Sequence, residues 1–210
     1  MLFRSVEYLP GDSGNSLRMW KYLKSQPCPK EENEEKRKAD LLQALLDIGQ
    51  SLPWILDIST LLALIVKKVK ELMNCQGASV LLLDRENHEL VFHTVLDEDE
   101  EVIKKLTGLR FPASKGIAGR VVQTGKAVFV RDVERDADHF KGVDEKTGGT
   151  TSSLLYAPLQ LHGRIIGILS AKDKKGTPFG ESDIHALTVI AETVALSVDN
   201  ACAHEKLMET

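Results

Sequence analysis

The hydrophobic positions after residue 30 follow helical spacing in three segments. Residues 31–48 begin with acidic side chains and continue into regularly spaced leucines, which predicts a helix that stops at Gly49. Residues 57–73 carry apolar side chains three and four positions apart, which predicts a second helix. The same spacing recurs over residues 181–208 and predicts the longest helix of the chain.

Strand patterns lie between these helices. Residues 78–83 and 89–96 flank a polar turn and predict a β-hairpin, and residues 154–172 predict a second hairpin with its turn at 162–164. Residues 109–112 and 127–133 predict short strands, residues 102–106 a short solvated helix, and residues 114–125 a capped helix. The long polar loop 134–151 predicts one irregular helix and a functional segment. This order favours an α+β fold with a mostly antiparallel sheet.

The chain divides into three predicted regions. Residues 1–30 hold prolines and glycines and few periodic apolar positions, so we expect a loosely ordered leader. Residues 31–50 are predicted to form an N-terminal linker helix, and residues 51–208 a single domain.

Composition narrows the classes of function. Of the 210 residues, 42% are hydrophobic and 28% charged, as in a globular protein with a core, and the net charge of −4 gives no reason to expect nucleic acid. The longest apolar run, residues 61–66, is far shorter than the ~20 residues of a membrane-spanning helix, so we expect no membrane. Because the N-terminus lacks the apolar core of a signal peptide, we expect a cytoplasmic protein.

No arrangement of catalytic side chains stands out in the sequence, so a non-enzyme is expected. The three cysteines contain no CxxC pair, which argues against a disulfide framework or a zinc site, and Cys75 and Cys202 are expected to be inert thiols. One dense polar cluster comprises Asp132, Asp136, Asp138 and His139. It could bind a divalent cation, but a solvated loop whose aspartates cap a helix is the favoured interpretation, so no metal is expected.

Two stretches of the sequence resemble the GAF domain family. GIAGRVVQTGKAVFVRDVERDADHF is similar to the family's glycine-rich turn, helix, strand and Asp-rich loop. SSLLYAPLQLHGRIIGILSAKDKKGTPFGESDIHALTVIAETVALSVDNA resembles its C-terminal half. The likeness covers about residues 40–205 and implies a central, mostly antiparallel sheet with helices on both sides and long terminal helices.

The resemblance implies a pocket for a small ligand between the sheet and residues 114–153. The ligand-binding residues expected from it are Ser79, Ile117, Ala118, Val130, Asp132, Asp138, His139, Phe140, Thr151 and Ser153.

Family members that bind cyclic nucleotides share an Asn-Lys pair, a Phe and an Asp-Glu pair. Lys172, Phe179 and Asp183 match this pattern and would supply a structural ion pair beside a buried Phe179, whereas Ala171 and Ile184 replace the Asn and the Glu. No cysteine falls in the pocket segments, so no bilin is expected, and haem, for which only His139 lies in a suitable region, is not expected either.

The resemblance therefore implies a non-catalytic sensory module that signals through its terminal helices, with a small-molecule ligand and a signalling partner protein. The stripe Ile184, Leu187, Ala191, Val194, Val198 and Ala201 has the spacing of a two-helix seam and predicts a homodimer, unless helices of the same chain cover it. The alternatives are a cyclic-nucleotide-binding domain, a structural dimerisation module without a ligand, and a small redox enzyme.

Overall fold

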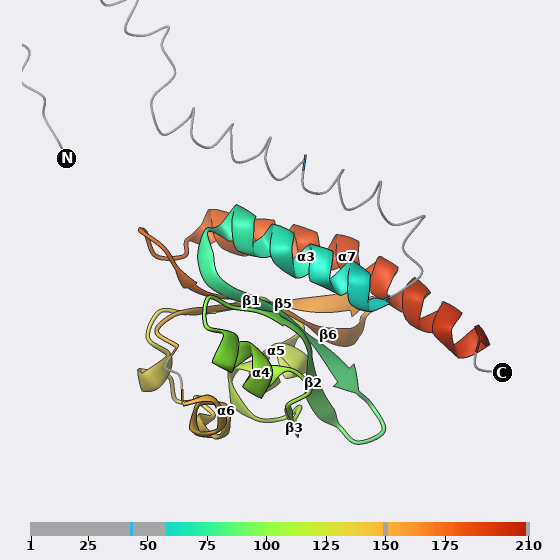
Figure 1. Ribbon diagram of the computed structural model, residues 1–210, viewed down its shortest axis with the longest axis horizontal. Coiled ribbons are helices and arrows are strands. Elements are labelled where there is room, and N and C mark those ends of the chain that lie inside the picture. Colours follow the sequence, from blue (N-terminus) through green and yellow to red (C-terminus); the bar gives the residue numbers. More distant parts are fainter. Residues whose placement is uncertain (1–42, 44–57, 149–150, 209–210) are drawn as a thin grey trace, which may run out of the picture. The chain divides into compact units, whose positions relative to one another are not determined.

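The computed structural model describes residue 43, residues 58–148 and residues 151–208 (Figure 1). The predicted leader and the linker helix lie outside these residues, except for Gln43, which is helical and exposed. The predicted domain boundaries stay predictions for that reason.

The centre of the domain is a six-stranded sheet in the order β3-β2-β1-β6-β5-β4, and every pairing is antiparallel. Both predicted hairpins are present. The strands are β1 (Cys75–Asp84), β2 (Glu89–Leu96), β3 (Arg110–Pro112), β4 (Val128–Val130), β5 (Leu154–Leu161) and β6 (Arg164–Lys174). The expected α+β class is confirmed. β4 is shorter than the predicted 127–133, because the chain leaves this edge of the sheet and turns into a 3-10 helix at Val133–Arg135.

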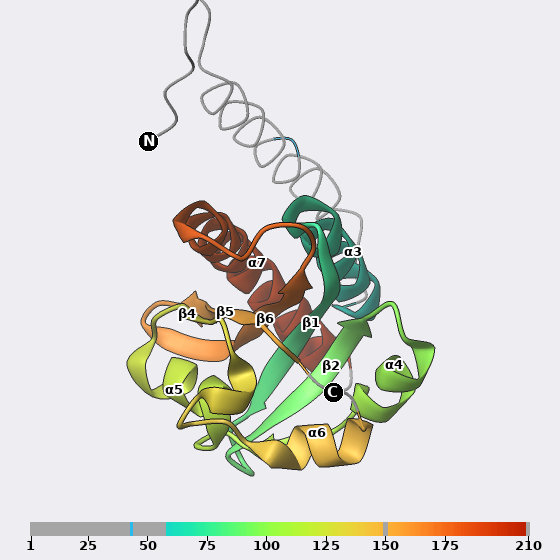
Figure 2. The ribbon, with the colours of Figure 1, turned by 90° about the vertical axis from the view of Figure 1, so that its left-hand side faces the viewer.

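Two helices cover one face of the sheet. α3 (Ile58–Met73) and α7 (Glu181–Met208) lie side by side there (Figures 1 and 2). Their apolar sides pack with sheet residues such as Val80, Leu155 and Leu169 into one core.

This packing corrects the predicted dimer seam. Leu187, Ala191, Val194 and Val198 are at most 1% exposed and belong to the core of their own chain. The alternative interpretation of the stripe holds, because α3 and the sheet cover these four residues from the same chain. Ile184 is partly buried against the same core, and the side chain of Ala201 lies outside the described part.

Three short helices cover the opposite face of the sheet: α4 (Glu100–Leu106), α5 (Gly116–Thr124) and α6 (Lys141–Thr147) (Figure 2). Asp99 caps α4 by accepting a hydrogen bond from the backbone N–H of Glu101. α4 is not the solvated helix that we predicted, since Val102 and Leu106 are 8% exposed and join a second core. α6 is the helix expected within the polar loop. No helix of the described segments is long and apolar enough to cross a membrane.

Candidate functional site

The second face of the sheet holds a cavity of about 110 Å³ beneath α4, α5 and α6. We call it the sheet cavity. Its floor is formed by alternate residues of β1, β6 and β5, which point to this face because successive side chains of a strand point to opposite sides. Its other walls come from β2, β3, the three helices and the loop before α6.

Polar side chains meet at the floor through cross-strand pairs. Ser79 of β1 lies opposite Ser170 of β6, and their hydroxyl oxygens are 2.6 Å apart at 5% exposure each. The hydroxyl of one donates to the other, which leaves a further lone pair on each oxygen for a ligand. Tyr156 of β5 lies opposite Ser170 on its other side. Burial, helped by the negative charge of Asp144, raises the pKa of the Tyr156 phenol well above its usual value, so this group stays a neutral donor.

A partly buried ion pair closes one end of the floor. The Nζ of Lys172 lies 2.7 Å from Oδ2 of Asp97, and the side chains are 22% and 7% exposed. Gly77 lies opposite Lys172 in the β1–β6 pairing. A Cβ at Gly77 would come within 2.5 Å of Asp97 Oδ2 and 2.7 Å of Lys172 Cε, so the absence of a side chain makes room for the pair.

The loop before α6 and α6 itself place an imidazole–carboxylate pair in the wall. Nε2 of His139 lies 2.7 Å from Oδ2 of Asp144, and since a carboxylate only accepts, Nε2 donates. Nδ1 of His139 is buried and has no hydrogen-bond partner among the residues that the structure describes. Phe140 follows and stacks with Phe111 at 6.1 Å between ring centroids, in contact with Gly116 at a positive φ of 72°.

Arg120 of α5 holds this loop in place. Its guanidinium reaches Asp136 at 3.2 Å and Asp138 at 3.0 Å, on either side of Ala137. The loop is therefore tied to α5 immediately before His139. Three aspartates of the predicted polar cluster therefore form ion pairs, Asp136 and Asp138 with Arg120 and Asp132 with Arg135. The expected helix capping is not found: Asp132 precedes the 3-10 helix without a capping side-chain hydrogen bond, and Phe140 holds the N-cap position of α6. Across the described segments, no group of three or more His, Cys, Asp or Glu side chains could hold a metal ion.

The structure brings six of the ten predicted ligand-binding residues to the cavity wall: Ser79, Ile117, Ala118, His139, Phe140 and Thr151. The other four do not line it. Val130 is buried at 7% exposure in the core, and Asp132 faces outward and pairs with Arg135 at 3.3 Å. Asp138 is occupied by Arg120, and the backbone N–H of Ser153 donates to the carboxylate of Asp173 at 2.8 Å.

The predicted ion pair between Lys172 and Asp183 is wrong. Asp183 pairs instead with Lys174, whose Nζ lies 2.5 Å away, and both side chains are about 5% exposed or less. The cause is Asp173, whose φ of 51° breaks the alternation of β6 and turns Lys174 to the α7 face while Lys172 faces the cavity. Phe179 is buried at 1% exposure, as expected, and Nζ of Lys174 lies 5.9 Å from its ring centroid.

Sequence reasoning missed several residues of the cavity: Gly77, Asp97, Lys115, Asp144, Tyr156 and Ser170. Two of these carried a usable signal. Tyr156 and Ser170 lie in the predicted second hairpin, where the alternation of side chains assigns each to a face. Asp97 and Asp144 gave none, because solvated acidic residues have the same local pattern.

Comparison with known families and proteins gives a consistent picture. The sequence profile of the GAF domain family matches residues 56–199. A probable 3',5'-cyclic phosphodiesterase of Caenorhabditis elegans, pde-5, is 30% identical over 180 residues, which are 81% of this chain and 24% of that protein. The nitrogen fixation protein VnfA of Azotobacter vinelandii is 24% identical over 77% of this chain and 31% of its own length. The chain thus spans about a quarter to a third of these relatives.

Solved structures share the fold. The GAF domain of a phosphoenolpyruvate-protein phosphotransferase from Coxiella burnetii superposes with a TM-score of 0.69 at 19% identity, over 80% of this chain and 98% of that one. A free methionine-R-sulfoxide reductase from Neisseria meningitidis superposes with a TM-score of 0.64 at 23% identity, over 78% and 90% of the two chains. At these identities the likeness concerns the fold alone.

Proposed function

The chain belongs to the GAF domain family, and we propose that its described domain is a non-catalytic sensory module that binds a small polar ligand in the sheet cavity. The observation that carries this proposal is the floor of that cavity. A domain that only needed a filled core would not place two buried serines and a partly buried ion pair there, since buried polar groups stabilise poorly compared with packed apolar ones.

The size of the cavity favours a ligand of few atoms. Its volume of about 110 Å³ is below the ~300–1,000 Å³ typical of pockets for drug-sized molecules. The lining offers hydroxyl groups, a cation and carboxylates, so the ligand is expected to carry hydrogen-bonding groups of both kinds. A larger guest would require α4 and α6 to move away from the sheet.

Two features support the non-catalytic role. The cavity lining contains no cysteine. Cys75 is the cysteine whose side chain the structure describes, and burial raises the pKa of its thiol to about 11. A thiol with that pKa is a poor nucleophile near neutral pH. Signalling would pass through α7, whose first turn is fixed to β6 by Asp183 and Lys174.

A homodimer and a signalling partner remain parts of the proposal. The surface available for dimerisation is the outer side of α7, where Leu196 is 51% exposed. We also propose that the protein is cytoplasmic.

The test is to identify a bound molecule. Mass spectrometry of the natively purified protein, after denaturation, should release a small polar compound. The Ser79→Leu variant, which removes a hydroxyl and fills the floor, should release none while keeping the circular dichroism spectrum of the sheet. Thr193→Val, on the exposed side of α7, is the matched control and should retain the compound. Equal amounts of released compound from both variants would show that the ligand binds outside the cavity.

Cyclic-nucleotide binding is the second candidate. The 30% sequence identity to the probable cyclic phosphodiesterase of Caenorhabditis elegans favours it. The small cavity argues against it. Titration calorimetry with cyclic AMP and cyclic GMP should therefore show no tight association. Micromolar binding of either that Ser79→Leu abolishes would establish the second candidate. If neither nucleotide binds and no compound is released, a purely structural dimerisation module would account for the chain.

A further inference from the structure

A second hollow lies at the other end of the sheet, between the β1–β2 turn, the β5–β6 turn and the C-terminus of α5. We call it the basic groove. It has a volume of about 540 Å³ and shares no lining residue with the sheet cavity. Its charged and polar side chains include Arg85, His88, Arg164, Gln123 and Gln160, and none of its lining residues is acidic.

Two arginines of this groove come from the ends of neighbouring strands: Arg85 directly follows β1, and Arg164 begins β6. β1 and β6 pair antiparallel with Leu82 opposite Gly167, so the end of β1 lies beside the start of β6. Nη2 of Arg85 donates to the backbone carbonyl of Ile165 at 2.9 Å, which fixes the guanidinium next to the β6 strand. Arg85 and Arg164 both carry a positive charge, and neighbouring like charges repel each other.

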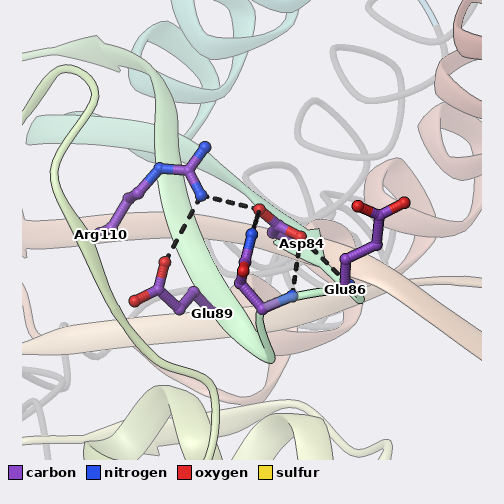
Figure 3. A network of polar contacts seen from close by, with 5 residues as sticks. Asp84, Glu86, Glu89 and Arg110 are labelled. Atoms are coloured by element: carbon purple, nitrogen blue, oxygen red, sulfur yellow. Dashed lines mark hydrogen bonds and ion pairs between the residues drawn. The ribbon is translucent and has the colours of Figure 1, made fainter.

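The carboxylate of Asp84, which directly precedes Arg85, is already occupied. Asp84 accepts hydrogen bonds from the side chain of Asn87 at 2.9 Å and from Arg110 at 2.7 Å (Figure 3). It also accepts from the backbone N–H groups of Glu86 and Asn87, so its charge holds the β1–β2 turn and pairs with Arg110. Within the described residues, neither Arg85 nor Arg164 forms an ion pair with a carboxylate.

We propose that the basic groove binds the phosphate group of a small phosphorylated molecule between Arg85 and Arg164. The guanidinium group presents donors in a planar fork that matches phosphate oxygens, and a phosphate between two arginines would relieve their mutual repulsion. The volume of about 540 Å³ exceeds what a phosphate group alone would fill and lies within the range of small-molecule sites. The amides of Gln123 and Gln160 can donate to and accept from hydroxyl groups on the rest of the molecule.

The site is independent of the proposed sensory cavity, and amide chemical shifts distinguish the two. Ribose 5-phosphate is the probe, and ribose and succinate are the comparison compounds. Titration of the ¹⁵N-labelled protein with ribose 5-phosphate should shift the amides of Arg85, His88 and Gly163 and leave those of Ser79 and Ser170 in place. Ribose and succinate should shift neither set.

Substitutions then test the two arginines. Arg85→Gln and Arg164→Gln should each weaken binding of ribose 5-phosphate by about tenfold, as expected for the loss of a charged hydrogen-bonding partner. Arg135→Gln is the matched control, because it removes the same charge from a side chain that is 88% exposed and does not line the groove. An equal loss in the control, absence of binding, equal binding of succinate, or shifts confined to Ser79 and Ser170 would each overturn the proposal.

Discussion

Asp97 and Lys172 form their ion pair directly over Gly77, at a distance of 2.7 Å between Nζ and Oδ2. Asp97 directly follows β2, Lys172 lies in β6 and Gly77 in β1, so one glycine determines whether two charges distant in the sequence can meet in the floor of the sheet cavity. Any side chain at position 77 has to displace one of the two partners.

Gly77→Ala should therefore separate the ion pair. Overpacking of this kind typically destabilises a protein by about 1–3 kcal/mol. Alanine is intrinsically preferred to glycine within a strand, so a loss of stability in Gly77→Ala would have to come from the crowded ion pair. Urea denaturation measures the change, and Gly180→Ala, whose Cβ would lie 4.0 Å from its nearest neighbour, is the control expected to change little. Unchanged stability of Gly77→Ala would show that Asp97 and Lys172 rearrange freely.

Lys174→Met should destabilise the domain strongly. It removes the cation that pairs with the buried carboxylate of Asp183, and breaking a buried pair costs about 3–5 kcal/mol. Lys175→Met is the adjacent control. Lys175 pairs with Glu98 at the surface, with nearly half of each side chain exposed, and such pairs contribute about 0–1 kcal/mol. Similar midpoints of thermal unfolding for both variants would contradict the assignment of Lys174 as the partner of Asp183.

Val194→Glu should unfold the domain rather than only dissociate a dimer, because Val194 is fully buried within its own chain and a buried unpaired charge is highly unfavourable. Leu196→Glu, at a position 51% exposed, should leave the fold intact. Circular dichroism tests the fold, and equilibrium sedimentation of the Leu196 variant tests the dimer. A Val194→Glu protein that is folded and monomeric would contradict this expectation and support the dimer seam that the sequence predicted.

The carboxyl group of Asp84 should titrate far below its ordinary range. The side chain of Asn87, followed by Arg110, hydrogen-bonds to the charged form and lowers the pKa of Asp84 (Figure 3). With the native pKa below the unfolded value of about 3.9, the stabilisation is complete above about pH 4 and is lost as the pH falls through the native pKa. Carboxyl ¹³C NMR should show a lower midpoint in the native than in the urea-unfolded protein, and Arg110→Gln should narrow the difference. Coincident midpoints would refute the network.

Cys75 should resist modification in the native state. Burial raises the pKa of its thiol to about 11, and the thiolate is the reactive form. Peptide mass spectrometry after iodoacetamide treatment at pH 8 should find Cys75 unmodified in native protein and modified after unfolding in urea. Rapid native modification would indicate that the β1 end opens readily.

The sheet and most helices were predictable because alternating and helical spacings are local patterns. Both hairpins and α7 follow directly from them. The cavity was predictable only in part. Ser79, Ile117 and His139 line the cavity, as the family resemblance implied. Asp97 lines it because of a contact with Lys172 that no local pattern of the sequence reveals.

Two errors have specific physical causes. The stripe containing Val194 has the same spacing whether another chain or α3 of the same chain covers it, so periodicity could not decide between them. The partner of Asp183 was misassigned because the positive φ of Asp173 reverses the direction of the next side chain. A positive φ is uncommon for a non-glycine residue, and the local sequence does not show that Asp173 adopts it.

The reversal at Asp173 also matters for comparing this chain with its relatives. Lys172, Lys174 and Lys175 are chemically alike, so an alignment displaced by two positions would look equally good by composition. It would nevertheless exchange a residue of the cavity floor for the one that anchors the first turn of α7. Relatives should be aligned here on the left-handed residue, with any gap placed after it, before a ligand preference is transferred between them.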